Sequence, residues 1–144
     1  MKNNKETIKS LNRLLQGEYM DLDSFNLFLS RIGDKDASNI MMEVQKDHRN
    51  NIEKLSNYIL ELGGKPEENI GMKGKMGGMM LRNQLRNPSD VNEVIRRAID
   101  GEEKGINKIE KILRGNLDYE SRNLTGQILE NDRNSIDKLR NMLI

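Results

Sequence analysis

Four ionisable residues occupy matched places in a sequence that nearly repeats itself. The stretch HRNNIEKL, which begins at His48, recurs as DRNSIDKL from Asp132, so the two positions differ by 84 residues (132 − 48). The same offset places Glu18 on Glu102. Carboxylate oxygens and an imidazole nitrogen are ligands that divalent transition metals accept in proteins. Together, the four side chains predict a site for one Fe, Mn or Zn ion.

Each of the four residues interrupts a stripe of apolar residues that recurs at alternating steps of three and four, as in helices packed in a bundle. The stripes consist of Ile8, Leu11, Leu15, Leu22, Phe25, Leu29 and Ile32; Met41, Val44, Ile52, Leu55, Ile59 and Leu62; Val91, Ile95, Ala98, Ile106, Ile109 and Leu113; and Leu124, Ile128, Ile136, Leu139 and Leu143. Burying unpaired carboxylates costs several kcal/mol. A metal ion would neutralise these carboxylates most directly.

Turn and capping residues divide these helices into two pairs, at about residues 8–62 and 91–144. We expect Gly33 to end the first helix in a left-handed conformation, and a residue of Asp34–Asp36 to cap the second, which should span about 37–62. Gly63, Gly64 and Pro66 then stop that helix.

A long connection, residues 63–90, joins the two helix pairs. A tight helix connection takes about 2–8 residues, so this one is long enough to cross the height of a bundle and make the third helix parallel to the second. Pro88, Ser89 and Asp90 should begin the third helix, with Asp90 and Glu93 at capping-box spacing. The predicted fold is therefore an all-α, up-down-down-up four-helix bundle, in one domain that spans residues 1–144.

The Met72–Leu85 part of the connection is rich in methionine and basic residues. Four glycines argue against a rigid helix before Met79; they are Gly71, Gly74, Gly77 and Gly78. Three uses remain open: a short amphipathic segment that covers one side of the bundle, a dimerisation or membrane-surface element, and a thioether site for copper. A homodimer or another protein partner would use this segment or the helix faces.

Composition excludes several function classes. Charged residues make up 33% of the chain, yet 24 basic and 23 acidic side chains leave a net charge of only +1, so no general attraction to nucleic acid is expected. Cysteine is absent, which excludes disulfides and thiolate chemistry. No apolar run approaches the roughly 20 residues of a membrane span, and we expect a cytoplasmic location.

The pattern of a Gly-Glu on one helix, a histidine on the next, a long crossover and then a second copy resembles the ferritin-like superfamily, including rubrerythrin relatives. It is most similar to small bacterial ferritin-like bundles grouped as a domain of unknown function. The di-iron site of that superfamily takes a Glu from each of two helices and a Glu-x-x-His from each of the other two. Glu18, His48 and Glu102 match this motif.

Three positions depart from the ferritin-like motif. Gln45 and Leu129 stand where the bridging glutamates would be, and Asp132 replaces the second histidine. Since bridging carboxylates hold the two metals together in such centres, the resemblance implies a degenerate site for one ion, with Gln45 as a weak fifth ligand. It also implies redox or peroxide chemistry if the protein is an enzyme, a question that the residues leave open.

A second interpretation needs no metal. Arg49 or Arg133 would reach inward and neutralise the acids, Glu18 and Glu102 would be partly solvated, and His48 would be a hydrogen-bonded core residue. The chain would then be a non-catalytic structural or interaction bundle whose metal site has decayed into a polar network.

Overall fold

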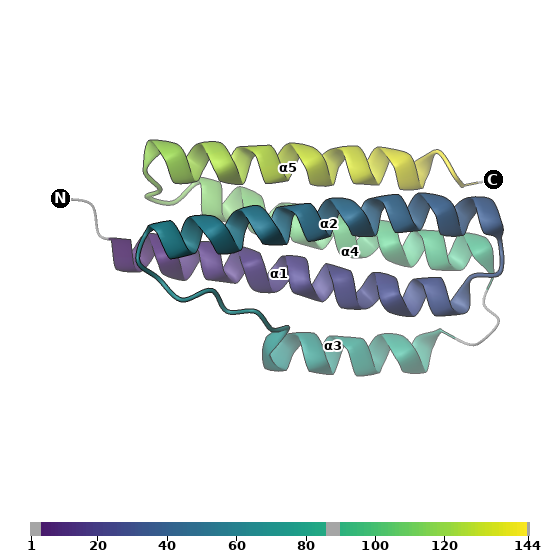
Figure 1. The fold of residues 1–144 in the computed structure, drawn as a ribbon. Helices are drawn as coiled ribbons and strands as arrows, with labels where there is room; N and C mark the ends of the chain where they lie inside the picture. The colour runs from purple at the N-terminus through teal and green to yellow at the C-terminus, as the bar shows by residue number, and fades with distance from the viewer. Residues whose placement is uncertain (1–3, 86–89, 144) are drawn as a thin grey trace.

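The computed structural model describes residues 4–85 and 90–143, and its core is a bundle of four long helices (Figure 1). These are α1 (Asn4–Arg31), α2 (Lys35–Glu61), α4 (Val91–Leu113) and α5 (Tyr119–Arg140). Helices α1 and α2 are antiparallel, as are α4 and α5, while α2 and α4 run in the same direction. The predicted up-down-down-up topology is confirmed.

Aspartate side chains cap three of these helices. Asp34 accepts a hydrogen bond from the backbone N–H of Ala37 at 2.8 Å, and Asp90 accepts one from that of Glu93 at 3.2 Å, both as predicted. Asp118 caps α5 in the same way. Each cap satisfies a helix N–H group that has no partner within the helix. The predicted helix start at Pro88 and Ser89 lies outside the described residues.

The predicted left-handed end of α1 at Gly33 is wrong. Among the described residues, positive φ angles occur only at Gly63 and Gly71, at 84° and 68°. After α1 ends at Arg31, Ile32 and Gly33 lead to the extended backbone of Asp34, whose φ and ψ are −80° and 125°. Because that residue also caps α2, no left-handed residue is needed between the two helices.

A fifth helix, α3 (Gly71–Gln84), lies against the outside of α1 (Figure 1). The expectation that its glycines would prevent a helix before Met79 is therefore wrong. At Gly74, a Cβ would come within 2.8 Å of Met20 Cγ and of Ile70 Cβ. The missing side chain thus allows α3 to approach α1 closely, and this packing outweighs the low helix propensity of glycine.

Polar side chains of α1 hold the connection that leads to α3. Asn12 donates a hydrogen bond to the carbonyl of Lys65 at 3.0 Å and accepts one from the N–H of Glu67 at 2.8 Å. Gln16 donates to Asn69 at 3.0 Å. The crossover is thus fixed to the bundle over its first half.

The buried core consists of two apolar clusters. One includes Phe25, Phe28, Met41, Val44, Val94, Ile95 and Leu139, and the other includes Leu11, Leu15, Leu55, Ile59, Ile109 and Ile128. The described helices include none that is both long enough and apolar enough to cross a membrane. Between the two clusters, the bundle carries a layer of polar side chains.

Candidate metal centre

The polar layer is built from all four bundle helices. Its members are Glu18 and Asp21 of α1, His48 and Asn51 of α2, Glu102 of α4, and Asp132 of α5. On α1 and α2 the paired residues are three positions apart, which places both side chains on the same helix face. The sequence-predicted quartet of Glu18, His48, Glu102 and Asp132 is therefore brought together in one layer.

His48 is fully buried at the centre of this layer. Its Nδ1 contacts Oε2 of Glu18 and lies 3.7 Å from both Asp21 Oδ2 and Asp132 Oδ1. Its Nε2 lies 2.5 Å from Oε1 of Glu102. Both ring nitrogens thus face carboxylates. An imidazolium satisfies both nitrogens as a donor, whereas a neutral ring donates from one and leaves the other to bind a metal.

Asn51 connects the two sides of the layer. Its amide nitrogen donates to Glu18 Oε1 at 2.9 Å and to Asp132 Oδ1 at 3.2 Å. Its own oxygen accepts from Asn131 at 3.2 Å. Asn51 is fully buried, so this bridge fixes the positions of two carboxylates from helices that are far apart in the sequence.

Burial and crowding retain protons in this layer. Burial, together with the charge of Glu18, raises the pKa of Asp132 to about 10, and burial likewise raises the pKa values of Asp21 and Glu102. Burial alone would lower the pKa of His48, but the facing carboxylates, Glu18 first, raise it well above its usual range. A divalent cation would replace these protons as the counter-charge.

The donor atoms suit one metal ion. One oxygen each from Glu18, Asp21 and Asp132 and one nitrogen of His48 all lie within 4.8 Å of one another. Ligands at about 2.0–2.2 Å from a metal are separated by roughly 3–4 Å. To bind an ion, the more distant donor atoms would therefore move slightly closer, while His48 Nδ1 and Glu18 Oε2, which are in contact, would move apart. Glu102 Oε2 is buried and makes no hydrogen bond within the described residues, which indicates an unmet partner beside the same site.

Residues 6–115 match the model of a protein family described as a domain of unknown function, DUF2383. The chain belongs to this family. No curated protein matches it. The matched residues include five of the six members of the polar layer, whereas Asp132 lies beyond them.

Solved structures share the fold of this DUF2383 chain at low sequence identity. A two-domain protein from Anabaena variabilis, with DJ-1/ThiJ/PfpI-like and ferritin-like domains, is 20% identical with a TM-score of 0.79; the match covers 98% of this chain and 36% of that one. A bacterioferritin-related protein from Bacteroides fragilis, described as a dodecameric thioferritin, is 17% identical with a TM-score of 0.74, over 96% and 84% of the two chains. A conserved hypothetical protein from Mycobacterium tuberculosis is 13% identical with a TM-score of 0.78, over 99% and 100%. The fold is therefore ferritin-like, and the chain spans about a third of the two-domain protein.

Three side chains considered from the DUF2383 sequence lie away from the layer. Gln45 donates to Asn26 Oδ1 at 2.7 Å and to the carbonyl of Leu22 at 3.3 Å, so its amide is directed toward α1. Arg49 is exposed, and Arg133 pairs with Glu110 at 3.5 Å on the surface. The alternative pairing in which one of these arginines reaches inward and neutralises the buried acids is therefore wrong.

Asp21 and Asn51 are the members that the sequence interpretation missed. Each follows a predicted site residue by three positions, and this spacing is the signal that would have identified them. The near-repeat did not indicate Asp21 as a site residue, because the residue 84 positions later (21 + 84 = 105) is Gly105, which has no ionisable side chain.

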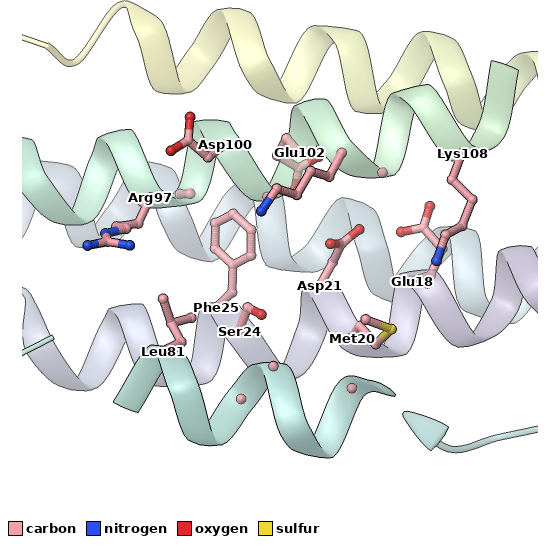
Figure 2. A pocket seen from close by; sticks show the side chains of 18 of the residues that line it. Glu18, Met20, Asp21, Ser24, Phe25, Leu81, Arg97, Asp100, Glu102 and Lys108 are labelled. Atoms are coloured by element: carbon pink, nitrogen blue, oxygen red, sulfur yellow. The ribbon is translucent and has the colours of Figure 1, made fainter. Parts of the chain in front are cut away.

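A cavity of about 490 Å³ reaches the layer from one side of the bundle (Figure 2). It lies among α1, α3 and α4, and its wall includes Glu18, Asp21, Glu102 and Asp132. The cavity thus ends at the layer on the side where α3 lies, and Asp21, which is 18% exposed, is the most exposed member of the layer.

Proposed function

We propose that the protein binds a single divalent transition metal ion, Fe, Mn or Zn, through His48 Nδ1 and the carboxylates of Glu18, Asp21 and Asp132. The observation that carries the proposal is the mutual distance of these four donor atoms, all within 4.8 Å of one another in a buried layer. Without a metal ion, one imidazolium cannot balance three buried carboxylates, so the carboxylates must keep protons at considerable cost; a metal ion would offset that cost. Helices α1, α2 and α5 supply the ligands.

Glu102 serves as the partner of the liganding histidine. Its carboxylate accepts a hydrogen bond from Nε2–H of His48, which leaves Nδ1 directed at the proposed metal. The sequence-based hypothesis made Glu102 a ligand; in the proposal, it orients the ring and makes it a stronger ligand.

The residues at the bridging positions support one ion rather than two. Leu129 is a buried apolar residue, and the amide of Gln45 is bonded to Asn26. Neither supplies the bridging carboxylate that holds a second metal in a two-metal centre. When bound, one ion with an open position supplies Lewis-acid or one-electron chemistry; redox or peroxide turnover is the corresponding enzymatic proposal.

The test is elemental analysis of protein purified without an affinity tag, and again after reconstitution with Fe(II), Mn(II) and Zn(II). We expect close to one metal per chain, lost in Glu18→Ala and Asp132→Ala. Asp137→Ala is the matched control, because Asp137 is exposed on the same helix as Asp132. Folded protein that takes up none of the three metals would refute the proposal.

The competing function is a non-catalytic bundle that associates with a second copy or a protein partner. One observation favours it: four methionines of α3 are exposed, namely Met72, Met76, Met79 and Met80. Such side chains adapt to partner surfaces. A metal-binding protein should lose thermal stability with a chelator, whereas an interaction bundle should not. Dissociation of an oligomer by Met76→Glu, measured by sedimentation, would support the interaction function.

A further inference from the structure

A second hollow, at the start of α3, is lined by charges of one sign. This basic groove is bordered by α1, by α4 and by the first turn of α3, and its volume of about 600 Å³ lies within the range of small-molecule sites. Its charged residues are Arg13 of α1, Lys73 of α3, and Lys108 and Lys111 of α4. No aspartate or glutamate of the described chain lines the basic groove. It thus differs from the cavity beside the polar layer, whose wall contains both acids and bases.

The four basic side chains of the groove are available to a ligand. All four are exposed, and the lysine and arginine ion pairs of the described chain involve other residues. Lys108 extends from α4 toward α1 (Figure 2) and also borders the neighbouring cavity, so Asp21 shares its charge. Arg13, Lys73 and Lys111 do not line that cavity. Because a cleft lined by one sign of charge concentrates counter-ions, the basic groove favours an anion.

The first turn of α3 adds to this positive charge. Gly71, Met72 and Lys73 begin the helix, and all three line the groove. Backbone N–H groups at the start of a helix carry a partial positive charge. This turn contains no acidic residue that would offset the charge, and Ile70 before it makes no side-chain cap; Asn69 accepts a hydrogen bond from the N–H of Gly71 only, at 3.0 Å. The helix start thus reinforces the basic side chains.

The remaining wall of the basic groove suits an organic group. Met20, Ile70 and Ile112 are half-buried and form its apolar part. Ser10 and Gln16 add uncharged groups that can form hydrogen bonds. Since apolar surface gains free energy when it leaves water, a ligand with both an anionic group and a carbon skeleton fits this wall better than an inorganic anion does.

We propose that the basic groove binds a phosphate monoester. Such a group carries a charge of about −1.5 to −2 at neutral pH and three acceptor oxygens, so it can bind several cations at once. Arg13, Lys73 and Lys111 would surround the phosphate, and the carbon skeleton would lie against Met20 and Ile112. A soluble ester and the headgroup of phosphatidic acid offer the same chemistry, and the experiment below separates them. The proposal does not rest on the proposed metal ion.

The experiment is a calorimetric titration of the full chain with phenyl phosphate, at low salt, after a chelator and dialysis have removed metal. We expect one site per chain, weakened at least about tenfold when Lys73 and Lys111 are both replaced with glutamine, because two charged partners of the phosphate are lost. Replacing both Lys46 and Lys54 with glutamine is the matched control. These two residues are exposed on α2 and do not line the groove, and the change in net charge is the same. This control should bind like the parent protein.

Sedimentation with phosphatidylcholine vesicles, with and without phosphatidic acid, identifies the source of the phosphate. Binding to phenyl phosphate alone would assign a soluble ester, whereas binding to phosphatidic acid vesicles that is lost in the Lys73 and Lys111 variant would assign a lipid headgroup. Failure to bind either form would overturn the proposal. So would equal weakening in the two double variants, which would show attraction to net charge and no site. Since no metal is present, this outcome is independent of the metal analysis.

Discussion

The Nε2 atom of His48 lies 2.5 Å from Oε1 of Glu102, while Nδ1 faces the carboxylates of Glu18, Asp21 and Asp132. The two nitrogens of one ring therefore have different neighbours: one carboxylate on the α4 side and three on the other. This division gives Glu102 and the other acids separate roles that substitution can distinguish.

Replacing Glu102 with glutamine should weaken metal binding by about 10–100-fold without unfolding the protein. The glutamine oxygen still accepts from Nε2 of His48, but the negative charge that strengthens the histidine as a ligand is lost. Competition titration with a chromophoric chelator measures the affinity. Glu103→Gln is the control, because Glu103 pairs with Arg140 on the surface at 2.7 Å. Unchanged affinity in Glu102→Gln would contradict the orienting role.

The metal-free protein should lose stability as the pH rises. The pKa of Asp132 is about 10 in the folded protein against an ordinary 3.8, and the pKa of His48 is also raised. The folded state thus binds protons that the unfolded chain releases, so the free energy of unfolding falls by about 1.4 kcal/mol per pH unit for each extra proton. For Asp132, the free energy of unfolding falls over the pH range between the ordinary pKa of 3.8 and the folded-state pKa of about 10.

Urea denaturation in the presence of a chelator, at several pH values between about 6 and 9, measures this slope. Asp132→Asn should reduce it by about one proton, or about 1.4 kcal/mol per pH unit. With metal added, the gain in the free energy of unfolding should increase as the pH rises, because the metal's ligands must be deprotonated. An identical slope in the parent and Asp132→Asn proteins would show that Asp132 is not protonated in the fold.

Replacing Asn51 with leucine should destabilise the fold by about 2–4 kcal/mol, because Glu18 and Asp132 each lose a buried hydrogen-bond donor. Thermal or urea denaturation measures the loss. Asn50→Leu is the control on the adjacent, exposed position, and we expect a change within about 0.5 kcal/mol. Equal effects of the two substitutions would show that the amide bridge contributes nothing specific.

The sequence was sufficient to predict the bundle and the central histidine, because helical periodicity identifies buried stripes and an ionisable residue on such a stripe stands out. His48 and Glu102 are of this kind. Asp21 is not: it lies beside the stripe, next to the apolar stripe residue Leu22, and its side chain is 18% exposed. Its spacing of three residues from Glu18 was the one local signal, and its distance of 3.7 Å from His48 Nδ1 shows that it faces the same site.

The sequence was misleading at Gly33, Gly74 and Gln45. Intrinsic preferences predicted a left-handed helix end at Gly33 and irregular backbone around Gly74, yet an aspartate cap and a close helix contact decided both positions. The resemblance to the ferritin-like motif predicted Gln45 as a weak ligand, but its amide donates a hydrogen bond to Asn26 on α1. Such competing partners come from distant parts of the chain and have no local signal.

The glycines of α3 should respond differently to alanine. Gly77→Ala should stabilise α3 by about 1 kcal/mol, because alanine favours the helix and its Cβ meets no atom within 4 Å. Gly74→Ala should push α3 away from Met20, because its Cβ would lie 2.8 Å from that side chain. Native-state proteolysis within α3 measures both effects: slower cleavage for Gly77→Ala and faster for Gly74→Ala. Similar rates in the two variants would contradict the close contact.

Gly74 is also the single buried residue of α3, whereas each bundle helix buries seven or more. Such a helix belongs to the least protected part of a fold, so its amide hydrogens should exchange with solvent at a much smaller free-energy cost than those of α1 or α2. We therefore expect α3 to open locally more readily than the bundle, and α3 forms one side of the cavity whose wall includes Glu18 and Glu102. The rate at which solvent reaches the buried layer would then depend on how often α3 opens, while the four bundle helices remain packed.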